Sequence, residues 1–421
     1  MSKITTSSVA AGDVVDVPLL KLESSGMMMM GKGITTMQFY KGDSQEAVQF
    51  LKERLQLVAE QNPWICATIV KGTGGLKALR YPKAVSIDQI FAQDDTLVLT
   101  QEIPYQELVQ RVGKSSAHVP SGSTIMKTKC PVTKCTVAKT GSSDGFVVLF
   151  SISHVIADGF TYYSILDMIF EGAEIFPMDP VRNEAYREKL PDVIGKKDEK
   201  WMTKPGCGQI CNFLGIMCCG RKNMPVYCYT VDPEKLKAEK EKAKTAPGAP
   251  EFVSTNDILT SGFGRATQTR LLTMAMDFRG RIDGLTKQTA GCYHAGLLFG
   301  PECYESAGSI RKALTGPAPL SRAGKLPGCC GATKGNWTAM ISNWSSASKG
   351  NYSIPNCEHL LHIPYVQTKD MPVDFCIVFK ARKDEVAVML GLQYGQFADL
   401  KAELPIDKPI SANMFVEGPP S

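Results

Sequence analysis

Hydrophobic positions recur with a helical period in the segment 44–63, SQEAVQFLKERLQLVAEQNP. Four of them lie three or four residues apart, which places them on one face of a helix: Val48, Leu51, Leu55 and Val58. Ser44 can cap the first turn through its hydroxyl, and Pro63 cannot continue a helix because its nitrogen carries no proton. The pattern predicts a helix over 44–63 that buries one side.

Apolar, β-branched runs alternate with helical segments through the rest of the chain. These runs predict buried strands: 34–40, 64–70, 145–153 and 271–282. Helical spacing returns at 159–173 and 255–270, and two strand-like runs around a charged turn predict a hairpin at 373–394. Such alternation of strand and helix predicts an α/β fold.

The chain divides into three parts. Its 421 residues exceed the ~250 to 300 at which a single hydrophobic core stops growing, so two domains are expected. Residues 176–250 are punctuated by proline and charge and contain a cysteine-rich insertion, as is typical of a linker. We expect an N-terminal domain over 1–175, a crossover linker over 176–250 and a C-terminal domain over 251–421.

Composition narrows the class of protein. The 47 lysines and arginines exceed the 42 acidic residues by only five charges, too few for a phosphate-binding surface, so we expect no nucleic-acid partner. No apolar run reaches the ~18 to 20 residues that span a bilayer, and the N-terminus lacks the apolar core of a secretory signal. We expect a cytoplasmic monomer with reduced cysteines; peripheral membrane contact stays open.

The segment FVVLFSISHVIADGFTYYSIL (146–166) carries candidate chemistry. It places His154 just after a predicted buried strand, where open α/β sheets present reactive groups, and Asp158 and Gly159 follow. An unperturbed imidazole is largely neutral at neutral pH, so one ring nitrogen can take a proton from a hydroxyl or amine. This predicts a general base at His154; the alternative is a core histidine bound to backbone.

Asp158 has two interpretations. It could act in catalysis, or its carboxylate could face away from the histidine and hold the loop. The predicted strand 271–282 places Asp277, Arg279 and Arg281 on one face, and a guanidinium there could bind Asp158 through paired charge-assisted hydrogen bonds. We favour the structural interpretation, and we expect Gly159 to supply a backbone conformation that a Cβ would penalise.

Four segments match one pattern in order. HVIADGFTYYSIL carries an HxxxDG motif, STNDILTSGFGRAT (254–267) an S-x-x-D-x-L-T helix, MDFRGRI (276–282) a D-x-R-x-R strand and ISNWSS (341–346) a T-S-W-like stretch. Together they resemble the superfamily of CoA-dependent acyltransferases, which includes the BAHD (HxxxD) enzymes, wax ester synthases, alcohol acetyltransferases and the condensation domains of peptide synthetases. The likeness runs from about residue 35 to about residue 400.

The resemblance implies a fold and a site. The fold would be α/β, with two similar chloramphenicol-acetyltransferase-like domains, each a mixed β-sheet flanked by helices, and an active-site tunnel at their interface. His154 would be the base, and Asp158 would form an ion pair with Arg279. Ser342 and Trp344 would donate hydrogen bonds to the thioester oxyanion. Acyl-CoA would be a co-substrate, without a further cofactor or metal, and a small-molecule alcohol or amine the acceptor.

One element of the plant-type BAHD enzymes is missing. Where they have DFGWG, this chain has SASKGNYSIPNCEHLLHIP, and the letters DFC at 374–376 stand too far along, inside the predicted hairpin, to replace it. The departure argues against the plant-type branch rather than against the chemistry.

Other features stay outside this assignment. The cysteine-rich segment 207–219 lacks the paired CxxC knuckles of a zinc site, and we interpret it as an insertion that packs on the protein, with a membrane-touching loop as an alternative. The run Met27–Met30 is interpreted as a flexible or packed loop. The lysine-rich segment 234–244 is interpreted as a solvated face, with binding of the CoA phosphates as the alternative. Four histidines are expected at the surface or in the core: His118, His294, His359 and His362.

We therefore expect an acyl-CoA-dependent O- or N-acyltransferase in which the acceptor attacks the thioester directly. A condensation-type enzyme with a carrier-protein thioester and a non-catalytic relative that binds an acyl ligand or a partner are the alternatives. Acceptor identity, acyl chain length and O- versus N-acylation depend on loops that pattern analysis does not place.

Overall fold

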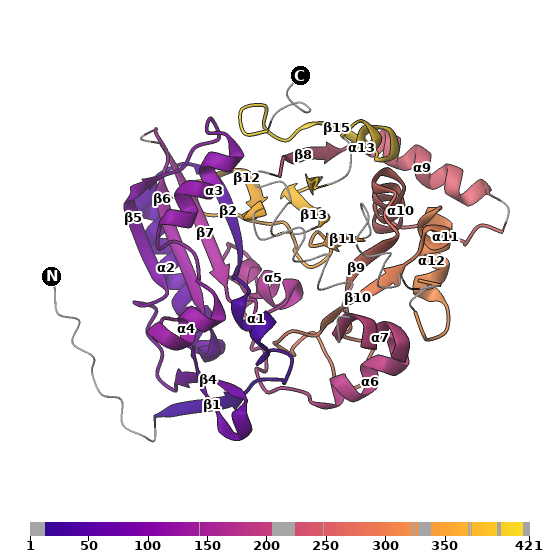
Figure 1. Ribbon diagram of the computed structural model, residues 1–421. Coiled ribbons are helices and arrows are strands. Elements are labelled where there is room, and N and C mark those ends of the chain that lie inside the picture. Colours follow the sequence, from indigo (N-terminus) through magenta and orange to yellow (C-terminus); the bar gives the residue numbers. More distant parts are fainter. Residues whose placement is uncertain are drawn as a thin grey trace.

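The structure is a computed structural model (Figure 1). Its described residues are 13–142, 144–203, 224–246, 248–320, 323–324, 326, 338–368, 371, 373–393 and 397–415. Two mixed β-sheets carry helices on their outer faces, as expected for the fold. A smaller sheet has three strands: β1 (Val14–Pro18), β4 (Lys77–Pro82) and β3 (Thr68–Lys71).

The first main sheet has five strands in the order β12-β2-β7-β6-β5. Their bounds are Glu358–Pro364 (β12), Ile34–Lys41 (β2), Gly145–Ile152 (β7), Thr133–Lys139 (β6) and Phe91–Val98 (β5). β5 and β6 are parallel, and the other neighbours are antiparallel. The edge strand β12 comes from the C-terminal part of the chain, so that part completes the sheet of the N-terminal part.

The second main sheet has seven strands in the order β10-β9-β11-β13-β14-β8-β15. Their bounds are His294–Phe299 (β10), Leu271–Asp277 (β9), Thr338–Asn343 (β11), Asp374–Arg382 (β13), Glu385–Gly391 (β14), Val226–Val231 (β8) and Ile406–Pro409 (β15). The hairpin expected at 373–394 is present as β13 and β14. The range 176–250, which the sequence assigned to a linker, supplies β8 to this sheet because Tyr227, Tyr229 and Val231 pack into its core.

Helices connect and cover these sheets. Their bounds are Gly26–Met30 (α1), Ser44–Gln61 (α2), Tyr105–Lys114 (α3), Gly122–Thr128 (α4), Gly159–Met168 (α5), Ala185–Ile194 (α6), Lys196–Thr203 (α7), Pro233–Thr245 (α9), Thr255–Thr267 (α10), Pro301–Tyr304 (α11), Ala307–Thr315 (α12) and Phe397–Glu403 (α13). Asp43, rather than Ser44, caps α2. The strand predicted over 64–70 is a 3₁₀ turn, Pro63–Cys66, followed by the short β3.

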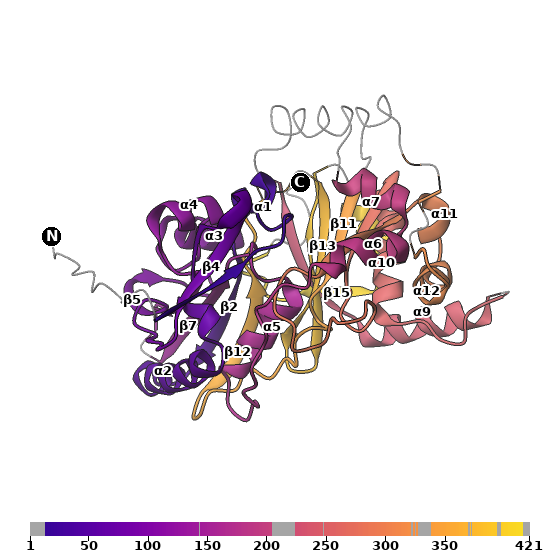
Figure 2. The same ribbon diagram turned by 90° about the horizontal axis from the view of Figure 1, so that it is seen from below.

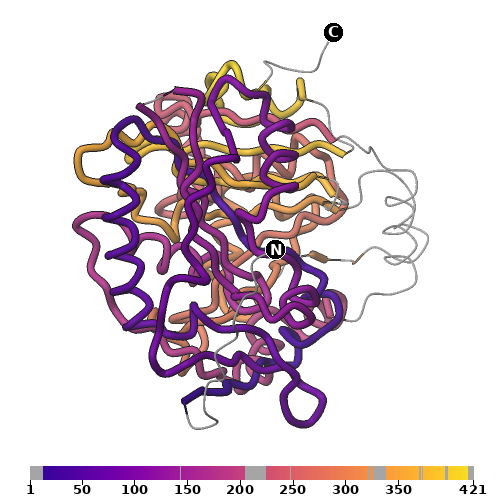
Figure 3. Tube along the Cα trace, turned by 90° about the vertical axis from the view of Figure 1, so that its left-hand side faces the viewer, coloured from indigo at the N-terminus to yellow at the C-terminus, as the bar shows by residue number. Residues whose placement is uncertain are grey.

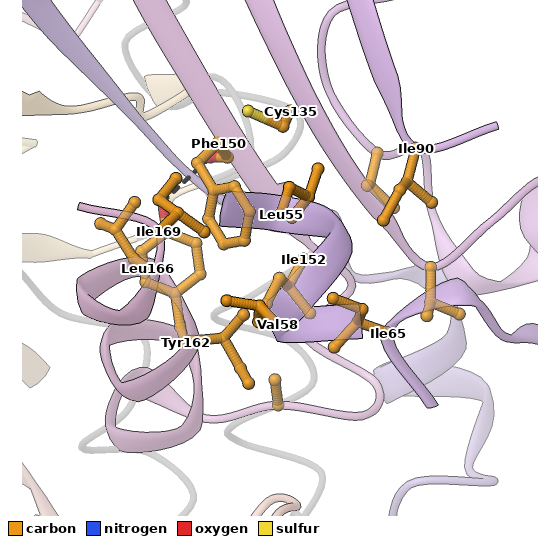
Figure 4. Close-up of a cluster of buried hydrophobic side chains, with 14 of the residues drawn as sticks. Leu55, Val58, Ile65, Ile90, Cys135, Phe150, Ile152, Tyr162, Leu166 and Ile169 are labelled. Carbon is orange, nitrogen blue, oxygen red and sulfur yellow. Dashed lines mark hydrogen bonds between the residues drawn. The ribbon is translucent and has the colours of Figure 1, made fainter. Parts of the chain in front are cut away.

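The strand β7 is buried on both faces. Phe150 and Ile152 pack against α2 and α5 (Figure 4), and Val148 belongs to the same core, whereas Val147 and Leu149 enter a different core. Double burial explains why its sequence is a continuous apolar run instead of an alternating one. Packing from both sides also holds the end of β7, from which the candidate catalytic loop departs.

The two main sheets share a hydrophobic core. Side chains of β2, such as Phe39, meet side chains of β13, such as Phe375 and Ile377, in this core. Figure 3 shows the indigo and magenta N-terminal part in front of the orange and yellow C-terminal strands. The helix α5 lies between the two main sheets (Figures 1 and 2). A core that both parts of the chain build opposes their separation.

Asp167 of α5 is a buried carboxyl group, only 7% exposed. It accepts hydrogen bonds from the Ser348 hydroxyl at 3.2 Å and from the backbone N–H of Lys349 at 2.7 Å. Burial raises the pKa of Asp167 from 3.8 to about 6, and these hydrogen bonds oppose the rise only in part.

Asp167→Asn is expected to stabilise the protein at neutral pH relative to the wild type. Because the folded pKa of Asp167 is raised above the unfolded value, folding favours the protonated carboxyl, and the wild type loses stability as pH rises from about 4 to about 6. This difference in pKa corresponds to about 3 kcal/mol, which the asparagine avoids. Denaturant unfolding of both proteins at about pH 4 and pH 7.5 measures the change in their stability difference.

The control is Asp384→Asn, in the exposed turn between β13 and β14. Its stability should follow the wild type at both pH values. A stability difference between Asp167→Asn and the wild type that does not change with pH would contradict the role given to burial.

Candidate active site

His154 lies in the loop between β7 and α5, two residues beyond the end of the strand. Its Nδ1 is 2.9 Å from the carbonyl oxygen of Ala157. A carbonyl oxygen can only accept, so Nδ1 carries the ring proton and Nε2 keeps its lone pair. The loop therefore selects the tautomer that a general base needs, in a side chain that lines the large cavity of the protein.

Asp158 is the N-cap residue of α5, and protein groups surround its carboxylate. It accepts hydrogen bonds from the backbone N–H groups of Thr161 and Tyr293, both at 2.9 Å, and from Arg279 at 2.8 and 3.3 Å. Burial alone would raise the pKa of Asp158, but the charge and hydrogen bonds of Arg279 outweigh it and the pKa is lowered. This arrangement agrees with the loop-holding interpretation of Asp158.

Arg279 forms the expected ion pair with Asp158, but it lies in a turn and not in the predicted strand. The strand β9 ends at Asp277, and Arg279 lies in the turn that follows, with its side chain 2% exposed. Its other hydrogen bonds reach three segments: the Thr289 and Gly291 carbonyls, the Thr161 hydroxyl and the Asp277 carboxylate. The strand predicted over 271–282 was wrong beyond Asp277, because the polar alternation there belongs to a turn that buries the arginine.

Gly159 does not have the strained backbone expected of it. It is the first residue of α5, and its φ lies outside the left-handed region. A Cβ at this position would lie 3.8 Å from the Trp344 ring, an ordinary van der Waals distance. The expectation was wrong because the chain turns at Asp158, whose φ of −84° and ψ of −178° any residue adopts. Gly159 instead leaves room beside Trp344 in the cavity wall.

A second buried ion pair holds the same loop. Glu23 and Arg182 lie 2.8 Å apart, with side chains 0% and 3% exposed. Arg182 donates to the carbonyl of Ile156 in the loop at 3.3 Å, and Glu23 accepts from the backbone N–H of Cys292 at 3.2 Å. The sequence analysis missed this pair. Its members are 159 residues apart in segments without a motif, so no local signal could have revealed it.

His294 is a second histidine in the cavity wall. Its ring stacks on that of His154, with centroids 5.4 Å apart and planes inclined by 23°. Burial, followed by the nearness of His154, lowers the pKa of His294 to about 4, so this ring is neutral at neutral pH. The expectation of a surface or core histidine was wrong, because the pairing of β10 with β9 sets His294 opposite Asp277.

Ser342 and Trp344 lie at the end of β11 and just beyond it, and both line the cavity with His154. The Trp344 indole N–H donates to Ser342 Oγ at 3.0 Å. The indole proton therefore has an acceptor within the protein, which differs from the expectation that it points at a ligand. A serine hydroxyl that accepts this bond still has its own proton to donate.

The cavity has a volume of about 1680 Å³ and is lined by both parts of the chain. The N-terminal part contributes α1, the start of β2 and the His154 loop; the C-terminal part contributes the N-terminus of α10 and strands β9 and β11. Single drug-sized ligands occupy sites of ~300 to 1,000 Å³, so this cavity has room for two substrates.

Among the described residues, no group of three or more histidine, cysteine or acidic side chains could hold a metal ion. In the same residues no helix is long and apolar enough to cross a membrane. The cysteine-rich segment 207–219 lies outside the described residues.

Three solved structures share this fold. TRI101 of F. graminearum, complexed with coenzyme A and T-2 mycotoxin, matches with a TM-score of 0.62 at 13% identity, over 92% of this chain and 96% of that chain. Vinorine synthase matches with 0.59 at 14%, over 94% of both chains. The first condensation domain of the CDA synthetase matches with 0.57 at 14%, over 92% and 93%. No protein-family model and no curated protein matches the sequence.

At these identities the comparisons establish the fold. The chain has the α/β architecture common to TRI101, vinorine synthase and a condensation domain, over nearly the full length of each. The α/β fold with mixed sheets flanked by helices, expected from the HxxxDG resemblance, is thereby confirmed, and the tunnel between the domains stays a prediction.

Proposed function

We propose that the protein is an acyl-CoA-dependent acyltransferase that transfers an acyl group to the hydroxyl or amine of a small molecule. The observation that carries the proposal is His154, whose Nδ1 hydrogen bond to Ala157 leaves Nε2 basic in a cavity large enough for two substrates. The coenzyme A bound to TRI101, which has the same fold, supports the choice of donor.

In the proposed reaction, His154 Nε2 takes the proton of the acceptor while the acceptor oxygen or nitrogen attacks the thioester carbon. The tetrahedral intermediate then collapses, and its C–S bond breaks. Protonated His154 returns the proton to the leaving thiolate, so the products are an ester or amide and free CoA. No covalent enzyme intermediate is needed. Asp158 and Arg279 hold the loop throughout without exchanging a proton.

The oxyanion of that intermediate needs a hydrogen-bond donor. Ser342 would supply it, and the Trp344 indole, bound to Ser342 Oγ at 3.0 Å, would fix the hydroxyl and leave its proton for the substrate. Trp344 would thus act through Ser342 in this step.

The direct test is release of free thiol from acetyl-CoA and longer acyl-CoAs in the presence of a panel of alcohols and amines. Release that requires an acceptor supports the proposal. Absence of release with every donor and acceptor overturns it in favour of the second candidate or of a binding role.

The second candidate is a condensation-type enzyme, and the fold match to a condensation domain favours it. Its donor would be a thioester on the phosphopantetheine arm of a carrier protein. Consumption of free acyl-CoA distinguishes the two candidates, because a carrier-dependent enzyme would leave free acyl-CoA intact.

Ser342→Ala is expected to lower kcat by about 10² while KM for acyl-CoA stays nearly constant, because the lost hydrogen bond forms in the transition state. Steady-state thiol release measures both constants. The matched control is Ser345→Ala, whose hydroxyl bonds Asn343 at 2.7 Å and does not line the cavity. Equal kcat in the two variants would remove Ser342 from the mechanism.

A further inference from the structure

Among the described residues, six methionines line the cavity. Three come from the strands of the seven-stranded sheet: Met274, Met276 and Met340. The other three belong to α1 and to the segment after β12, and we call them the methionine wall: Met27, Met30 and Met371. The run Met27–Met30, set aside in the sequence as a loop, therefore contributes to the cavity.

The helix α1 buries one methionine and leaves two others outside the core. Met29 is 3% exposed and packs in the core, and its carbonyl accepts a hydrogen bond from the Ser123 hydroxyl at 3.1 Å. Met27 and Met30, three residues apart, share another face of the helix and are 68% and 71% exposed. Both line the cavity, so they lie at its rim and offer apolar surface to a ligand.

Charge is distributed unequally around the cavity. The opposite wall carries four charged side chains: Asp257, Asp277, Arg281 and Arg311. In the described N-terminal part, two charged side chains line the cavity. Asp158 is neutralised by Arg279, and the Lys32 ammonium contacts the Gln367 side chain. The helix α1 lies apart from α10 and α12 in both views (Figures 1 and 2). Most charged side chains of the cavity lining therefore lie on the side of α10, β9 and α12, and the charged residue next to Met30 on the other side is Lys32.

We infer that the acceptor is an elongated apolar alcohol or amine whose hydrocarbon body lies along the methionine wall with its reactive group at His154. The inference rests on the proposed function and names its substrate class. Methionine side chains are flexible and polarizable and adapt to apolar bodies of different shape. The charged side is the poorer surface for such a body, because ion pairs lose solvation against apolar groups without gaining partners.

The test uses a series of alkan-1-ols, from ethanol to octan-1-ol, and the matching alkan-1-amines, with acetyl-CoA as donor. In the wild type, kcat/KM should rise with chain length. The variant Met27→Gln/Met30→Gln should lower kcat/KM for octan-1-ol about 10-fold more than kcat/KM for ethanol, the effect of losing one or two methionine contacts with the longer acceptor. Met27→Leu/Met30→Leu keeps the apolar surface and should behave as the wild type.

Leu57→Gln is the control, since Leu57 is 48% exposed on α2 and does not line the cavity. Equal activity with short and long acceptors, or a glutamine variant that affects only long-chain acyl-CoAs, overturns the inference and leaves the acyltransferase proposal intact. If no acceptor supports thiol release, calorimetric binding of octan-1-ol to the wild type and to the glutamine variant decides the inference separately. Weaker binding by the variant supports it, and equal binding overturns it.

Discussion

His154→Ala is expected to lower turnover by about 10² to 10⁴ while the protein still folds. The variant removes the nitrogen that would take the acceptor proton, and binding contacts elsewhere in the cavity remain. His154 is partly exposed to the cavity, and its hydrogen bond to Ala157 is local, so its loss should change unfolding little. Thiol release from acyl-CoA at saturating acceptor gives kcat, and thermal unfolding checks the fold.

The matched control is His359→Gln on β12, a histidine that does not line the cavity. It should keep wild-type turnover. Wild-type-like turnover in His154→Ala would exclude general-base catalysis by this residue.

Asp158→Asn is expected to destabilise the protein by about 3 to 5 kcal/mol, because it leaves the guanidinium of Arg279 buried without its main charge partner. Both side chains of the pair are 2% exposed, so water cannot replace the lost carboxylate. Denaturant unfolding measures the change in the free energy of unfolding. The double variant Asp158→Asn/Arg279→Met removes both charges and should recover part of the loss.

An exposed ion pair of the same kind provides the control. Arg80 binds Asp16 through two hydrogen bonds of 2.7 and 2.6 Å, with side chains 48% and 45% exposed. Asp16→Asn should cost less than about 1 kcal/mol, because solvent screens the pair and replaces the lost partner. Equal losses from Asp16→Asn and Asp158→Asn would show that burial does not set the importance of the Asp158 pair.

Local patterns in the sequence were enough for most elements of the fold. The helix 44–63, the strand ending before His154 and the hairpin near residue 380 all appear where periodicity predicts them, because each buries a face that the residue order defines. The predicted strand boundaries were wrong where a turn has the same order of apolar and polar residues as a strand. At 64–66 a 3₁₀ turn buries Trp64 and Ile65, and after Asp277 a turn buries Arg279.

Local sequence patterns could not predict which residues contact the His154 loop. The motif pointed to His154, and its resemblance to a known superfamily suggested Arg279. Glu23 and Arg182 had no signal, because a lone acidic or basic residue in an irregular segment looks like any solvated charge until the fold buries it.

The sequence by itself determined the α/β class, through the alternation of strand-like and helix-like segments. It also determined the HxxxDG loop and the candidate base, which depend on residue order over fewer than about twenty positions. Only the tertiary structure decided that β8 and β12 join their sheets, that His294 stacks on His154 and that Met27 and Met30 line the cavity. Each of these features is a contact between segments far apart in the chain. Such contacts arise from packing of the whole molecule, which no single segment encodes.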